Sequence, residues 1–115
     1  MIKIYHNTKC SKSRQALDYM KENGLEPEVT EYLKVIPSIE EFKKVLAKLN
    51  MKPEQLLRKG EKLYKEKLKN LNLSDDEWIH IMLENPELIE RPIIVKGNRA
   101  VVGRDIEKIA DLFKK

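Results

Sequence analysis

The chain has 115 residues, of which 41% are hydrophobic and 37% are charged. This length fits one domain with one core, because compact domains run to roughly 100–150 residues, and we expect a single domain over residues 1–115. No apolar stretch approaches the ~20 residues that a transmembrane helix needs, so we expect no membrane partner. Lys and Arg exceed Asp and Glu by 23 to 19, for a net charge of +4. Because this excess is spread along the chain, it favours a small anion over a nucleic acid as ligand.

The first third of the chain predicts a β-α-β unit. A short apolar strand at residues 2–5 ends in a polar loop at residues 6–9, and helix-forming residues follow from residue 11 to residue 22. A second strand is expected around Val29, Tyr32 and Leu33. The first helix therefore begins at the end of the loop, next to Cys10.

Two capping-box sequences mark helices in the middle of the chain. Ser38 with Glu41 and Ser74 with Glu77 have the spacing at which a serine and a glutamate cap a helix start. Apolar residues at helical spacing follow each pair. We therefore expect a helical insertion at about residues 38–88.

The last part of the chain predicts a hairpin and a helix. Apolar runs at residues 93–95 and 100–102 flank a turn that contains Gly97, and Asp105 can cap a final helix. The whole order is β-α-β, helical insertion, β-β-α. It predicts an α/β fold with a four-stranded mixed sheet.

Cys10 is the only cysteine, so an internal disulfide is excluded. A helix N-terminus lowers the pKa of a thiol, because its free N–H groups and its dipole favour the thiolate. Lys9, Lys12 and Arg14 add positive charge nearby, and His6 lies across the short loop. We therefore expect a Cys10 pKa well below the free value of about 8.5. The alternative is a small buried side chain without chemistry, a common fate of free cysteines.

Three arginines are candidates for binding an oxyanion next to this thiol. The free amides of a helix start can hold such an anion, and arginines would complete the site. Arg58, Arg91 and Arg104 each stand at the end of an apolar element or beside a turn. The alternative for each is an ordinary surface position. Their convergence does not follow from the sequence alone.

Pro92 directly precedes an expected strand, where its missing N–H removes a sheet hydrogen bond. An edge position or a cis peptide would accommodate it, and an ordinary trans proline is the alternative. We expect no metal site, because His80 has no second histidine or acid at ligand spacing.

Four segments together form a recognisable pattern: Tyr5-His6-Asn7-x-x-Cys10-x-x-Ser13-Arg14, Leu56-Leu57-Arg58-Lys59, Glu90-Arg91-Pro92-Ile93-Ile94-Val95 and Gly103-Arg104. In this pattern the chain resembles the glutaredoxin-coupled arsenate reductase family over nearly its whole length. The resemblance implies a thioredoxin-like fold with a helical insertion. It also implies that Pro92 matches the cis-proline of that fold.

The resemblance implies a role for each candidate residue. Cys10 would be the nucleophile, and Arg58, Arg91 and Arg104 would bind the oxyanion and lower the thiol pKa. The supporting residues would be His6, Ser13, Arg14 and Pro92. The implied reaction begins with attack of the thiolate on arsenate, after which glutathione and glutaredoxin reduce the adduct and arsenite leaves. Glutathione would be a co-substrate, and no cofactor would stay bound.

Two other functions remain open within the same superfamily. Spx-like regulators bind RNA polymerase and often carry a Cys-x-x-Cys switch at this loop, where this chain has Ser13 in place of the second cysteine. That difference counts against a regulator but does not exclude one. The other alternative is a thiol protein that binds glutathione or another small anion and reduces no arsenate. Because residues 1–7 show no secretory signal, we expect a cytoplasmic protein, and we expect it to be a monomer.

Overall fold

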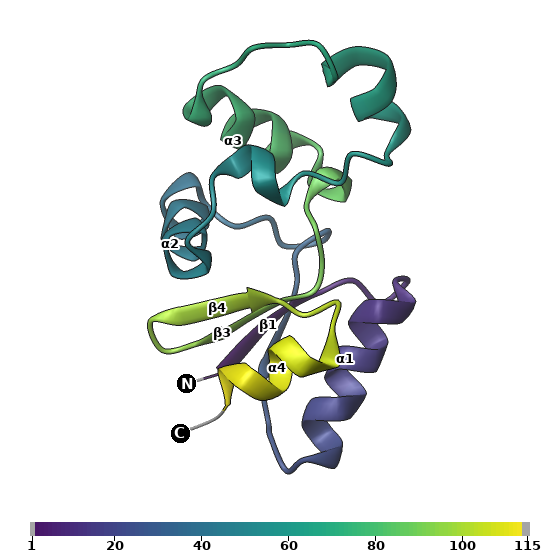
Figure 1. The fold of residues 1–115 in the computed structure, drawn as a ribbon, viewed down its shortest axis with the longest axis vertical. Helices are drawn as coiled ribbons and strands as arrows, with labels where there is room; N and C mark the ends of the chain where they lie inside the picture. Colours follow the sequence, from purple (N-terminus) through teal and green to yellow (C-terminus); the bar gives the residue numbers. More distant parts are fainter. Residues whose placement is uncertain (1, 114–115) are drawn as a thin grey trace. The chain divides into compact units, whose positions relative to one another are not determined.

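The structure, a computed structural model, describes residues 2–113 (Figure 1). These residues form two compact units. The sheet unit comprises residues 2–35 and 91–113, and the helical unit comprises Ile36–Glu90. The expected helical insertion at about residues 38–88 lies in the helical unit, and the single-domain organisation stays a prediction.

The sheet unit is built on four strands: β1 (Ile2–His6), β2 (Glu28–Glu31), β3 (Ile93–Lys96) and β4 (Arg99–Val102). Their order in the sheet is β2-β1-β3-β4. β1 runs parallel to β2 and antiparallel to β3, which in turn pairs antiparallel with β4. The predicted four-stranded mixed sheet is confirmed.

The second strand is shorter than the sequence predicts. β2 ends at Glu31, and the Glu31 carbonyl accepts the N–H groups of Lys34 and Val35 at 2.9 and 3.0 Å. These two bonds turn the chain out of the sheet, so Tyr32 and Leu33 lie beyond the strand. Tyr32 is nevertheless buried. The apolar residue that suggested a longer strand is thus buried in a turn instead.

Two helices, α1 (Ser11–Glu22) and α4 (Ile106–Leu112), cover the same face of the sheet. Ile4 of β1 and Ile94 of β3 are partners in the register and point to this face. The core that they form with the helices consists of Ile4, Ala16, Met20, Ile94, Ile109 and Leu112. The apolar residues that recur with a period of two in the strands and of 3.6 in the helices thus pack together in one layer.

The helical unit contains α2 (Ile39–Leu49) and α3 (Asp75–Glu84), two short 3-10 helices, η1 (Pro53–Leu56) and η3 (Pro86–Leu88), and a π-helix, η2 (Tyr64–Leu68). The helices α2 and α3 of this unit begin at the predicted capping residues. Ser38 Oγ accepts the N–H of Glu41 at 3.1 Å. Ser74 and Glu77 exchange both bonds of a capping box, at 3.1 and 3.2 Å.

The register of β1 and β3 positions the loop that carries Cys10. Tyr5 pairs with Ile93, so the chain leaving β1 and the chain entering β3 lie at the same edge of the sheet. The Arg91–Pro92 peptide at this edge is cis, as the resemblance implied. Its position is fixed by the residue that follows β4, because the Gly103 N–H donates to the Pro92 carbonyl at 2.7 Å.

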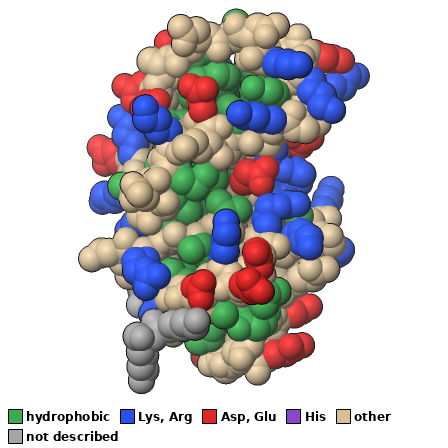
Figure 2. Space-filling view, in the orientation of Figure 1, with side chains coloured by type: hydrophobic (Ala, Val, Ile, Leu, Met, Phe, Trp, Pro, Cys, Tyr) green, Lys and Arg blue, Asp and Glu red, His purple; other side chains and the backbone are tan. Residues whose placement is uncertain are grey.

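Charges of both signs are interspersed on the visible surface. Figure 2 shows Lys and Arg side chains scattered among Asp and Glu side chains on the face that it draws. This distribution agrees with a charge excess that is spread along the sequence. Among residues 2–113, no helix combines the length and the apolar character that crossing a membrane requires.

Candidate active site

Cys10 lies at the N-cap of α1, where the sequence placed it, and it is partly exposed. Its backbone is extended, with φ −93° and ψ 121°. The Cys10 N–H donates to the Asn7 carbonyl at 3.0 Å, and the Cys10 carbonyl accepts the N–H of Arg14 at 3.0 Å. A tight turn therefore delivers the thiol directly to the first turn of the helix, whose N–H groups lack partners within the helix.

The surroundings of Cys10 lower the pKa of its thiol. Partial burial acts in the opposite direction and raises the pKa, because it disfavours the charged form. The backbone N–H of Ser13 and the Arg91 side chain outweigh burial, since both donate hydrogen bonds to the sulfur, and the Arg91 charge and the Lys12 N–H add to them. The helix start and one arginine thus favour the thiolate together.

A buried network of hydrogen bonds fixes the loop that precedes Cys10. His6 and Ser13 are both buried, and His6 Nδ1 lies 2.6 Å from Ser13 Oγ. The same oxygen accepts the N–H of Asn7 at 3.1 Å. Ser13, on α1, is thereby tied to the end of β1 through two neighbouring residues.

The protonation of His6 fits this network. Burial lowers the pKa of His6; the charge of Glu31 raises it, and the charges of Lys21 and Arg14 lower it further. Because Ser13 Oγ receives the Asn7 N–H, its hydroxyl hydrogen can be donated to Nδ1 of a neutral imidazole. Arg14, an exposed residue, therefore acts on the histidine that supports the loop.

Arg104 lies next to Arg91 in the sheet unit. Its Nη1 donates to the Arg91 carbonyl at 3.2 Å, and its side chain is exposed. Gly103, just before it, packs tightly: a Cβ there would lie 2.7 Å from Ile94 Cδ1 and 3.3 Å from Pro92 Cγ. The absence of a side chain at Gly103 lets β4 approach the cis-proline closely.

Arg58 lies in the helical unit and has two acidic neighbours there. Its Nη1 is 3.4 Å from Glu61 Oε1, and its Nε is 3.9 Å from Glu90 Oε1. Backbone bonds fix its place, because the Arg58 N–H donates to the Leu88 carbonyl at 2.7 Å. The structure thus brings Cys10, Arg91 and Arg104 together in one unit and gives Arg58 a carboxylate environment of its own.

Asn7 shapes the loop, and sequence reasoning did not single it out. Its Oδ1 accepts the N–H of Lys9 at 3.0 Å, and its backbone bonds both Cys10 and Ser13. The signal was present, because asparagine two residues before a free amide is typical of an Asx turn. Glu61 could also have been found as a partner of Arg58 from its spacing of three residues.

Metal-binding groups do not gather near this loop. Across residues 2–113, no three His, Cys, Asp or Glu side chains are placed to hold a metal ion together. A site without metal stays a prediction. The loop offers the chemistry of a thiolate beside guanidinium groups.

The family model described as the ArsC family matches residues 5–112. The chain belongs to the ArsC family. Among ArsC-family relatives, the uncharacterized protein YfgD of Escherichia coli K12 is 42% identical over 113 residues, covering 96% of this chain and 95% of that protein. An arsenate reductase of Neisseria meningitidis is 41% identical over 110 residues, covering 94% of each chain.

The solved ArsC-family structures agree with the fold. The structure of an arsenate reductase from Vibrio cholerae matches with a TM-score of 0.91 and 41% identity, covering 97% of each chain. The thioredoxin-like fold that the resemblance implied is therefore confirmed.

Proposed function

We propose that this protein reduces arsenate to arsenite, with glutathione and glutaredoxin as reductants, through a covalent adduct on Cys10. One observation carries the proposal: a partly exposed thiol with a lowered pKa accepts a hydrogen bond from the Arg91 side chain at a helix start. Full-length relatives from Neisseria meningitidis and Vibrio cholerae carry the name arsenate reductase, which supports arsenate as the anion.

The first step is a substitution at arsenic. The Cys10 thiolate attacks the arsenic atom and forms an S–As bond, while one As–O bond breaks and the protonated oxygen leaves as water. Arg91 would balance the charge on the remaining oxygens, and Arg104, whose guanidinium donates to the Arg91 carbonyl, is a second cation beside it. Arsenic remains As(V) in this step.

The reduction needs thiols from other molecules, because this chain has one cysteine. A glutathione thiol displaces a second oxygen as water and forms a second As–S bond. A glutaredoxin thiolate then attacks the glutathione sulfur, so that an S–S bond forms and the electron pair of that As–S bond passes to arsenic. Arsenic is thereby reduced to As(III), and hydrolysis of the Cys10–As bond releases arsenite.

The proposal is tested by measuring arsenite formation from arsenate with purified protein, glutathione and glutaredoxin. We expect turnover that stops when either reductant is omitted and that Cys10→Ser abolishes. A wild-type rate equal to that of the protein-free blank would overturn the proposal.

The surroundings of Arg58 favour a second candidate function. Glu61 and Glu90 already oppose its charge, which weakens the case that it binds a free oxyanion. A thiol protein that binds glutathione without reducing arsenate would show a glutathione adduct on Cys10 after exposure to glutathione disulfide, with no arsenite formed. Intact mass measurement detects that adduct. Capture of RNA polymerase by the purified protein would instead favour an Spx-like regulator.

A further inference from the structure

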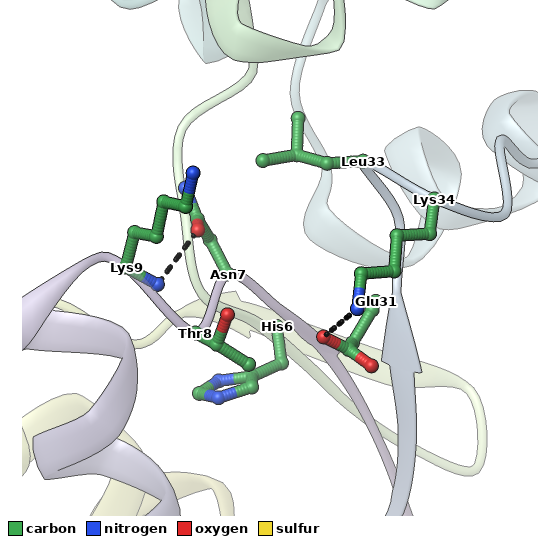
Figure 3. A pocket seen from close by; sticks show the side chains of 7 residues that line it. All are labelled: His6, Asn7, Thr8, Lys9, Glu31, Leu33 and Lys34. Carbon is green, nitrogen blue, oxygen red and sulfur yellow. Dashed lines mark hydrogen bonds and ion pairs between the residues drawn. The ribbon is translucent and has the colours of Figure 1, made fainter.

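A pocket lies beside the Cys10 loop, where β1 and β2 end (Figure 3). This edge pocket is lined by residues 6–9 and by Glu31, Leu33 and Lys34, and its volume is about 230 Å³. Sites that enclose a whole drug-sized ligand measure roughly 300–1,000 Å³. The edge pocket therefore suits one arm of a longer molecule.

The edge pocket is charged on two facing walls. Figure 3 shows Lys9 beside Asn7 on one wall and the Lys34–Glu31 pair on the other. Lys34 Nζ lies 3.5 Å from Glu31 Oε1, and the two side chains are 75% and 38% exposed. Exposed pairs of this kind are weak, so a ligand's own charges can replace them. Within residues 2–113, the Lys9 ammonium has no carboxylate within ion-pair distance.

This charge pattern matches an amino-acid group. Two ammonium groups can bind an α-carboxylate, and one carboxylate can bind an α-ammonium. Leu33, an exposed apolar residue at one end of the pocket, adds a surface for a methylene chain. A lone oxyanion bound by both lysines would take Lys34 from Glu31 and leave that carboxylate without its partner.

The wall formed by the loop links the edge pocket to the thiol. The Asn7 carbonyl accepts the Cys10 N–H at 3.0 Å, and Lys9 precedes Cys10 in the chain. A ligand that is anchored in the pocket therefore lies against the loop that carries Cys10. Glutathione has the required form, because its γ-glutamyl arm carries an α-carboxylate and an α-ammonium, and its thiol-bearing residue follows the amide bond at the end of that arm.

We infer that the edge pocket binds the γ-glutamyl arm of glutathione and directs the glutathione thiol toward Cys10. The inference rests on the proposed function, in which glutathione attacks the Cys10 adduct. It assigns Glu31, Lys9 and Lys34 to substrate recognition, a role separate from that of the arginines.

The first test is a titration of the isotope-labelled full chain with S-methylglutathione, which cannot form a disulfide. We expect amide chemical shift changes at residues 8–9 and 33–34. S-Methylcysteinylglycine, which lacks the γ-glutamyl arm, should leave these amides unchanged. Equal changes with inorganic phosphate alone would overturn the inference, because they would show a site for anions of any kind. Changes confined to other residues would overturn it too.

The second test separates the inference from the proposed function by kinetics. Lys34→Gln should raise the KM for glutathione roughly three- to tenfold, the range expected for loss of a partly exposed charged hydrogen bond, and leave the KM for arsenate unchanged. Lys44→Gln, at an exposed lysine of α2, is the matched control. An unchanged KM for glutathione in Lys34→Gln would overturn the inference while arsenate reduction stands. Binding of S-methylglutathione without arsenate turnover would preserve the inference and overturn the proposed function.

Discussion

Arg91 and Arg58 stand in similar places in the sequence, each at the end of an apolar element, but their surroundings differ. In the sheet unit, the Arg91 side chain donates a hydrogen bond to the Cys10 sulfur and lowers the pKa of the thiol. In the helical unit, Arg58 lies 3.4 Å from Glu61 and 3.9 Å from Glu90. The same side-chain type therefore supports an anionic nucleophile in one unit and balances carboxylates in the other.

This difference shows that an arginine's position in a motif does not fix its electrostatic role. A guanidinium that has carboxylates nearby has less positive potential to offer a free anion. Arg91 is expected to matter for both the thiol and the substrate. Arg58 is expected to contribute less, unless substrate displaces its acidic neighbours.

Among the substitutions that test this comparison of the two arginines, the largest effect is expected for Arg91→Ala. Loss of the guanidinium removes both the hydrogen bond and the charge that lower the Cys10 pKa, so that pKa should rise. Arsenate turnover should fall roughly hundredfold or more, as for the loss of one preorganised donor to an oxyanion. Alkylation rates measured against pH report the thiol pKa, and the arsenite assay reports turnover.

Arg99→Ala provides the control for this variant, because Arg99 is an exposed arginine in the same unit. It should leave the alkylation profile and the turnover unchanged. If Arg91→Ala and Arg99→Ala had the same alkylation profile, the assignment of Arg91 as the partner of the thiol would be wrong.

The next largest effect concerns the packing around Pro92, the residue after Arg91. Gly103→Ala would put a Cβ 2.7 Å from Ile94 Cδ1 and 3.3 Å from Pro92 Cγ. Overpacking of this kind costs typically about 1–3 kcal/mol, so the free energy of unfolding should fall by that amount in urea denaturation. Gly60→Ala is the matched control, because a Cβ at Gly60 meets no atom within 4 Å. Equal stability of the two variants would show that the approach of β4 to Pro92 is not tight.

The elements that repeat a local pattern could be predicted from the sequence. The caps at Ser38, Ser74 and Asp105 were correct, because a cap depends on residues within one helical turn. The position of Cys10 at a helix start was correct for the same reason. The end of β2 was wrong, because the apolar Tyr32 is buried in a turn, and periodicity alone does not separate that from a strand.

The partners of the site residues could not be predicted in the same way. The bond between Arg91 and Cys10 joins residues that are far apart in sequence, and it depends on the pairing of β1 with β3. The position of Glu90 beside Arg58 likewise depends on the fold. The isolated β-bridge between Leu57 and Ile89 brings the two residues together. Long-range pairing decides which charges become neighbours.

A smaller effect is expected when one of the carboxylates beside Arg58 is neutralised. Glu61→Gln removes a negative charge 3.4 Å from Arg58 Nη1. If Arg58 binds arsenate, the KM for arsenate should fall about two- to fivefold, the size expected for a partly exposed charge pair. Glu66→Gln is the matched control, because Glu66 pairs with the exposed Lys62 at 3.9 Å. An unchanged KM in both variants would indicate that Arg58 has a structural role.

The smallest effect concerns the buried histidine of the sheet unit, His6. Burial lowers the pKa of His6, so the unfolded chain binds its proton more tightly than the folded chain does. Between the lowered pKa and the ordinary value of about 6.5, the unfolded state carries more protons, and the free energy of unfolding must fall as pH decreases.

His6→Gln should reduce this dependence of the free energy of unfolding on pH, the slope, whatever it does to stability at neutral pH. Urea denaturation between pH 5 and 8, roughly the range over which histidines titrate, measures the slope. Equal slopes in the wild type and His6→Gln would show that the buried imidazole beside Ser13 does not resist protonation in the folded state.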